Sequence, residues 1–125
     1  MSTTCEQLEA MRGLPENWDG YGAAPPQPRV VDFAREFVSF LEVVLRKPVG
    51  SPFELQVSPT RVGGVLIEWE TSAVEHEVEI TPDHSMSFLH LDKATGQITT
   101  RRFSPNAGTV GNPAFFQELR QLLAA

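Results

Sequence analysis

The alternation of apolar and polar residues between Val65 and Ile80 constrains the fold of this chain most strongly. A period of two places one set of side chains on the buried face of a sheet and the other set in solvent. The inward set is Val65, Ile67, Trp69, Val74, His76, Val78 and Ile80, and the outward set is Glu68, Glu70, Glu75, Glu77 and Glu79. The pattern predicts two antiparallel strands joined at Thr71-Ser72, with Leu66 as an apolar exception among the glutamates.

A turn at Thr81-Pro82-Asp83-His84 leads to a further strand that extends to Leu91. Proline presets the backbone of the first turn position, and the aspartate can accept a hydrogen bond from the turn itself. A three-residue loop would pair Ile80 with Met86, whereas a two-residue loop would shift the register by one and turn Leu89 and Leu91 inward. We favour the three-residue loop.

Further segments complete the expected sheet. A strand over residues 97–103 follows a turn with Gly96. The pattern does not decide which side chains of this strand face the core. A candidate edge strand begins near Phe53 and ends at Pro59, because proline cannot donate to a sheet ladder.

Helices flank these strands. Pro28 opens a long helix that we expect to reach about Leu45, and Thr4 and Asn112-Pro113 begin shorter helices near the two ends. The long helix carries an apolar stripe on one side: Val30, Val31, Phe33, Ala34, Phe37, Val38, Phe40, Leu41, Val44 and Leu45. Such a stripe is wide enough to cover a sheet.

The expected fold class is α+β: a four- or five-stranded, mainly antiparallel meander with one long helix packed on its apolar face and short terminal helices. We expect one globular domain over residues 1–125. It comprises an N-terminal helix and a loop rich in Trp, Gly and Pro (1–27), the long helix (28–46), the sheet (53–103) and a C-terminal helix (112–125).

The composition narrows the function classes. A formal net charge of −6 and a pI near 5.0 argue against binding of nucleic-acid phosphates, for which Arg101-Arg102 is too short a basic stretch. The single Cys5 excludes an internal disulfide, and no stretch has the apolar length of a membrane span or a signal peptide. We expect a cytoplasmic protein without a cofactor or membrane contact.

The loop that precedes the long helix is the most distinctive motif. It reads Leu-Pro-Glu-Asn-Trp-Asp-Gly-Tyr-Gly-Ala-Ala-Pro-Pro over residues 14–26, and Gly63-Gly64-Val65 followed by Glu68-Trp69 comes later. With the Pro82-Asp83 turn, these motifs resemble a group of small bacterial and phage-encoded proteins to which no function is assigned; His84 replaces the turn glycine of that group. The resemblance implies one co-folded domain, and an accessory role such as an antitoxin, immunity protein or inhibitor.

The same loop contains three candidate binding residues, Trp18, Asp19 and Tyr21. Aromatic rings with polar tips supply much contact area, so they could form a small recognition surface for a partner or ligand. The alternative, which we favour on sequence alone, is an internal clamp in which Trp18 plugs the edge of the core and Asp19 bonds the turn backbone.

Glu75, Glu77 and Glu79 are the other candidate partner-binding residues, because together with Glu68 and Glu70 they form an acidic surface that a basic partner could recognise. The solvent-exposed face of a sheet often carries such residues for solubility alone. His76 and His90 could share a metal ion, but no third ligand is evident, so we expect two core histidines and no metal site. No catalytic set is evident.

We therefore expect a non-enzymatic protein-interaction or accessory domain with a protein partner or a self-association surface. The alternative is a small-molecule or metal-binding module that uses the loop between Trp18 and Tyr21 or the His76 and His90 pair.

Overall fold

The computed structural model describes residues 4–44, 55–83, 85–103 and 117. Its elements in chain order are α1 (Thr4–Met11), α2 (Pro28–Val44), β1 (Gln56–Pro59), β2 (Val65–Glu70), β3 (Val74–Ile80), β4 (Met86–Asp92) and β5 (Ile98–Phe103). The five strands form one antiparallel meander in the order β1-β2-β3-β4-β5. The α+β fold class expected from the sequence is confirmed.

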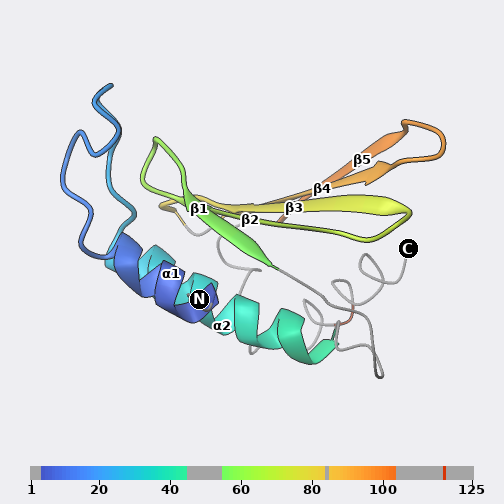
Figure 1. Ribbon diagram of the computed structural model, residues 1–125, viewed down its shortest axis with the longest axis horizontal. Coiled ribbons are helices and arrows are strands. Elements are labelled where there is room, and N and C mark those ends of the chain that lie inside the picture. The colour runs from blue at the N-terminus through green and yellow to red at the C-terminus, as the bar shows by residue number, and fades with distance from the viewer. Residues whose placement is uncertain (1–3, 45–54, 84, 104–116, 118–125) are drawn as a thin grey trace.

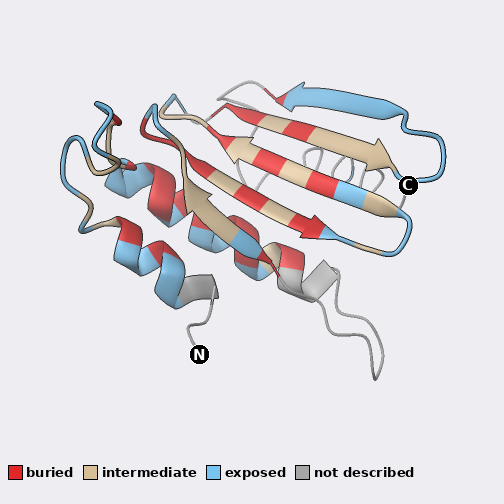
Figure 2. Cartoon of the chain, turned by 45° about the horizontal axis from the view of Figure 1, so that its top comes forward, coloured by how far each residue is buried: buried red, intermediate tan, exposed pale blue. Residues whose placement is uncertain are grey.

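The two helices lie on one side of the sheet, and no helix or strand of the described residues covers its other side (Figure 1). The apolar stripe of α2 faces the sheet, since Val30, Phe37 and Leu41 are fully buried, whereas Asp32 and Arg35 on the opposite side are exposed. Burial alternates along β2 and β3 as the sequence predicts (Figure 2). The buried apolar residues of both strands belong to one core cluster with those of the helices. One layer of helices and one sheet therefore enclose a single core.

The strand register follows the three-residue loop that we favoured. Ile80 pairs with Met86 and His76 with His90, so the core-facing sides of β3 and β4 are in phase. The backbone N–H of Thr81 donates to Ser85 O at 3.0 Å, and the N–H of Ser85 donates to the Asp83 carboxylate at 3.0 Å. The same register turns Leu89 and Leu91 away from the helices.

The structure also fixes what the sequence left open. Strand β5 begins at Ile98, one residue later than expected, and its pairing with β4 places Ile98, Thr100 and Arg102 on the side away from the helices. Residue 117 is helical, and the rest of the helix expected over 112–125 lies outside the described residues. The end of the long helix beyond Val44 and the expected start of the first strand at Phe53 also lie outside them.

The turn between β1 and β2 depends on two glycines. Gly63 has a φ of +84°, a region that residues with a side chain rarely adopt. Gly64 is buried, and its carbonyl accepts a hydrogen bond from Thr60 N at 3.0 Å. Hence the Gly63-Gly64 pair acts as a hairpin turn. Separately, none of the helices in the described part of the chain has the length and apolar character to cross a membrane.

Candidate functional site

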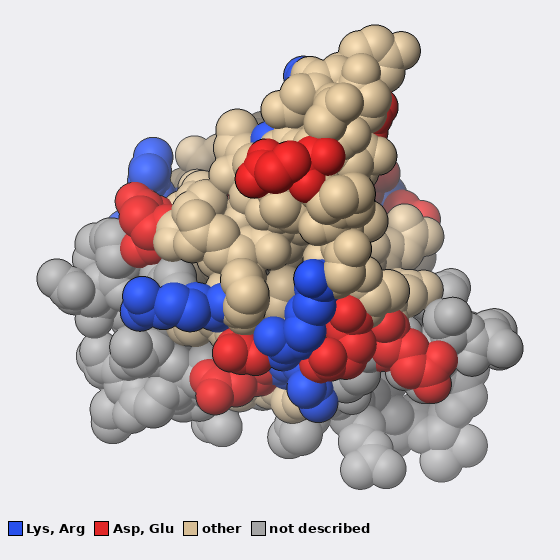
Figure 3. Space-filling view, turned by 90° about the vertical axis from the view of Figure 1, so that its left-hand side faces the viewer, with Lys and Arg blue, Asp and Glu red and all other residues tan. Residues whose placement is uncertain are grey.

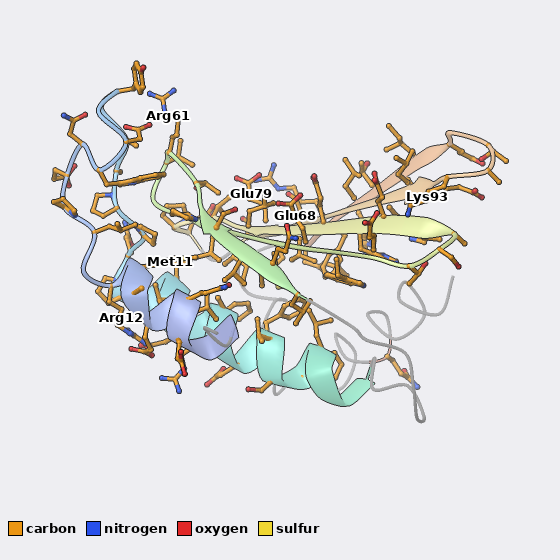
Figure 4. The ribbon with its side chains drawn as sticks, in the orientation of Figure 1. Met11, Arg12, Arg61, Glu68, Glu79 and Lys93 are labelled. Carbon is orange, nitrogen blue, oxygen red and sulfur yellow. The ribbon has the colours of Figure 1, made fainter. Side chains whose placement is uncertain are left out.

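The uncovered side of the sheet is the candidate functional surface, and we call it the outer face. It comprises the side chains that the register places away from the helices: Gln56, Ser58, Leu66, Glu68, Glu70, Glu75, Glu77, Glu79, Ser87, Leu89, Leu91, Ile98, Thr100 and Arg102. Glu68 and Glu79 lie on this side in Figure 4. The outer face therefore unites the glutamates predicted from the alternation with four apolar residues, Leu66 of β2, Leu89 and Leu91 of β4 and Ile98 of β5.

Strands β2 and β3 supply the acidic half of the outer face. Glu68 lies directly opposite Glu77, and Glu70 lies opposite Glu75. Glu70 forms an ion pair with Lys93 Nζ at 2.9 Å. The other glutamates of the outer face have no ion-pair partner among the described residues. Like charges on directly opposed positions repel each other, so the fold keeps this arrangement at a cost.

Strands β4 and β5 supply the apolar half. Leu89 and Leu91 are half-buried on the outer face, and Ile98, which pairs with Leu91, is 59% exposed. Leu66 adds a fourth apolar side chain beside Glu79. These side chains lie outside the core, and a group of partly exposed apolar residues next to charged ones is typical of an interaction surface.

The outer face is hollowed in two places. Most of the residues that line both hollows belong to it. The first hollow, of about 370 Å³, is lined by Gln56, Glu68, Trp69, Glu70, Glu75, His76, Glu77 and Leu89. The second, of about 330 Å³, is lined by Leu66, Glu77, Glu79, Ser87, Phe88, Leu89, Thr100, Arg101 and Arg102. The two hollows share Glu77 and Leu89, so they adjoin each other where the acidic and apolar halves meet.

A projection stands at one end of this surface, and we call it the lobe. It consists of residues 17–24 together with the turn 60–63, which are joined by a parallel bridge between Ala24 and Val62 and by a hydrogen bond from Ala24 N to Arg61 O at 2.9 Å. Both segments rise on the side of the sheet opposite to the helices (Figure 1). Seen from this end, the projecting part is made mostly of uncharged residues (Figure 3).

The three candidate residues of the lobe differ in their burial and in their hydrogen bonds. Trp18 is half-buried, and its Nε1 donates to Ala24 O at 2.9 Å. The Asp19 carboxylate accepts from the N–H groups of Tyr21 and Ala23 at 2.8 and 3.1 Å and from Arg61 Nε at 2.9 Å. Tyr21 is 82% exposed. Trp18 and Asp19 thus hold the loop together, and only Tyr21 presents its side chain to solvent.

Opposing effects act on the ionisation of Asp19. Partial burial would raise its pKa, but the two backbone hydrogen bonds and the Arg61 guanidinium outweigh burial and hold the pKa of Asp19 below its usual range. The carboxylate is therefore charged at neutral pH, and its attraction to Arg61 links the two segments of the lobe.

The two candidate histidines lie on the core side of the sheet. The His76 ring stacks on Trp69 at a centroid distance of 4.9 Å and meets the His90 ring edge-on at 4.8 Å. Burial, aided by the nearby His90, lowers the pKa of His76 to about 4. No group of three His, Cys, Asp or Glu residues in the described ranges could hold a metal ion.

Comparisons of the chain with models of protein families, with curated proteins and with solved structures find no match. Any function has to be inferred from the chain's own surfaces.

Sequence reasoning found the acidic half of the outer face but missed the apolar half and Arg61. The favoured register already implied that Leu89 and Leu91 point outward, so that signal was present. Nothing in the sequence signalled the ion pair between Asp19 and Arg61, which joins residues 42 positions apart.

Proposed function

We propose that this protein is a non-enzymatic interaction module that binds a basic, amphipathic segment of another protein on its outer face. The single observation that carries the proposal is the concave outer face, on which glutamates without an ion-pair partner among the described residues adjoin half-buried and exposed apolar residues. A helix with an apolar side bordered by Lys or Arg would match the apolar and the acidic half of the outer face at once. Leu89, Leu91 and Ile98 would receive its apolar side, and Glu75, Glu77 and Glu79 its cations.

Charge complementarity favours a basic protein segment over two other partners, a second copy of the chain and nucleic acid. A second copy of the chain docked face to face would bring two sets of glutamates together, and like charges oppose such contact. Nucleic acid would meet the same repulsion from its phosphates. A cationic protein segment, in contrast, is attracted by the glutamates of the outer face that have no ion-pair partner in the described part of the chain.

The stability cost of the acidic half supports a binding role. Glu68 opposite Glu77 and Glu70 opposite Glu75 each cost about a few tenths of a kcal/mol. Solubility alone needs charge, but it does not need like charges on facing positions. Surfaces that sacrifice stability in this way are often the ones that function requires.

The cellular setting belongs to the proposal as well. The single cysteine fits a reducing cytoplasm, and the resemblance to bacterial and phage-encoded proteins fits an accessory role of the antitoxin, immunity or inhibitor kind. In each of these roles a small acidic domain would cover a basic surface of its target.

The proposal is tested with a defined probe, an 18-residue amphipathic peptide of leucine and lysine, titrated by fluorescence anisotropy. We expect binding to the wild-type protein and about tenfold weaker binding to Glu75→Gln/Glu77→Gln/Glu79→Gln, because three partly exposed charge contacts contribute about 0.5 kcal/mol each. The melting temperature of this variant should be equal or slightly higher, since repulsion within the outer face is relieved.

The matched control is Glu6→Gln/Glu16→Gln/Glu36→Gln, which changes three exposed glutamates away from the outer face. Both variants have a formal net charge of −3 in place of −6, so they differ only in where the charge is removed. The proposal is wrong if the wild-type protein does not bind the peptide, or if the two variants weaken binding equally.

A further inference from the structure

Tyr21 combines a fixed backbone with an exposed side chain. Glycines with positive φ flank it, Gly20 at +77° and Gly22 at +84°, and its own N–H is held by the Asp19 carboxylate at 2.8 Å. Its carbonyl accepts a hydrogen bond from Arg61 Nη2 at 2.6 Å. The residue is nevertheless 82% exposed, next to a chain segment in which Val62 is 63% exposed. The backbone of this residue is thus ordered before any partner arrives.

Other hydrogen bonds in the lobe hold the backbone on both sides of Tyr21. Asn17 has a positive φ of 61°, its N–H donates to Ala23 O at 2.9 Å, and its side chain accepts from Gly22 N. Asp19 and Arg61 then fasten the loop to the turn between β1 and β2. An ordered aromatic residue in solvent gains nothing for the core, but it lowers the entropy cost of binding.

The lobe is continuous with the outer face. Gly63 and Gly64 link Val62 directly to β2, whose first outward residue is Leu66, and Leu66 pairs with Glu79. Leu66 and Glu79 also line the second hollow. Since the lobe rises on the uncovered side of the sheet, a segment lying in that hollow would meet it at this end (Figure 4).

We infer that Tyr21 is an anchor residue for the same basic partner, with Asp19 and Arg61 as the residues that position it. The inference rests on the proposed function. The face of a tyrosine ring attracts Lys and Arg side chains, and its edge and Val62 offer apolar contact, so the ring suits the end of a cationic amphipathic segment. Tyrosine is also among the residues that contribute most binding energy at protein interfaces.

The test uses the same leucine and lysine peptide and three variants of the lobe. Tyr21→Ala should weaken binding about fivefold to tenfold with an unchanged melting temperature, because the ring touches little of the protein itself. Tyr21→Phe should bind like the wild type, because it keeps the ring. Asp19→Asn should weaken binding about threefold with Tyr21 in place, because it loosens the position of the ring.

The outcomes separate this inference from the proposed function. If the triple glutamine variant of β3 binds weakly but Tyr21→Ala binds like the wild type, the anchor role is wrong and the outer face remains the binding site. If Tyr21→Ala weakens binding and the triple variant does not, the proposed function is wrong and so is the inference that depends on it. If the wild-type protein does not bind the peptide, both are overturned.

Discussion

Gly64→Ala is expected to lower the free energy of unfolding by about 3 kcal/mol, because an added Cβ would lie 2.3 Å from Ile80 O and 3.0 Å from Thr60 Oγ1. The carbonyl belongs to the central strand β3, and Val65, the next residue of β2, pairs with Ile80. A backbone atom in this position cannot move without separating two strands. For a domain of ordinary stability this is a large fraction of the total.

Thermal and urea unfolding of the variant would measure this loss. Gly13→Ala is the matched control, because a Cβ at Gly13 would meet only Ala10 O at 3.8 Å, an ordinary contact. We expect the control to unfold like the wild type. Equal stability of Gly64→Ala and Gly13→Ala would contradict the close approach of β2 and β3 at this point.

The second large effect is a loss of stability in mild acid caused by His76. Burial against Trp69, together with the neighbouring His90, lowers the pKa of His76 from 6.5 to about 4 in the folded protein. The unfolded chain therefore binds a proton at a higher pH than the folded chain does. Stability from this group is complete above pH 6.5 and falls as the pH drops towards 4. Between pH 7 and pH 4.5 the loss amounts to about 2 kcal/mol.

Urea unfolding at a series of pH values would show this slope. In His76→Phe the slope between pH 7 and pH 4.5 should nearly disappear, since carboxylates titrate mostly below this window. His90→Gln should keep most of it, because the burial of His76 remains. An unchanged slope in His76→Phe would mean that another group causes the acid sensitivity.

The sequence predicted the sheet well because its signals are local. A period of two fixed which side chains of β2 and β3 face the core, and the chemistry of Pro82 and Asp83 fixed the register of β4. The facing of β5 could not be read in the same way, because its apolar residues Ile98 and Phe103 lie five positions apart and so on opposite faces. Local pattern therefore determined the acidic half of the outer face, and only pairing revealed Ile98.

The contacts between the two segments of the lobe could not be predicted from the sequence. Trp18, Asp19 and Tyr21 were recognisable as unusual loop residues, but Asp19 and Tyr21 make contacts with a turn some 40 residues later. Arg61 is one arginine among several in the sequence. Its contacts with the Asp19 carboxylate and the Tyr21 carbonyl join the two segments of the lobe, and neither contact follows from composition or spacing.

Chemical-shift mapping of the backbone amides, with the leucine and lysine peptide added to isotope-labelled protein, tests the central claim most directly. We predict that the largest shifts fall on β2, β3, β4 and β5 and on the lobe, and that the exposed side of α2, around Arg35 and Glu36, stays unchanged. A control peptide of leucine and glutamate should cause no shifts. Shifts confined to α1 and α2, or equal shifts with both peptides, would contradict a basic partner on the outer face.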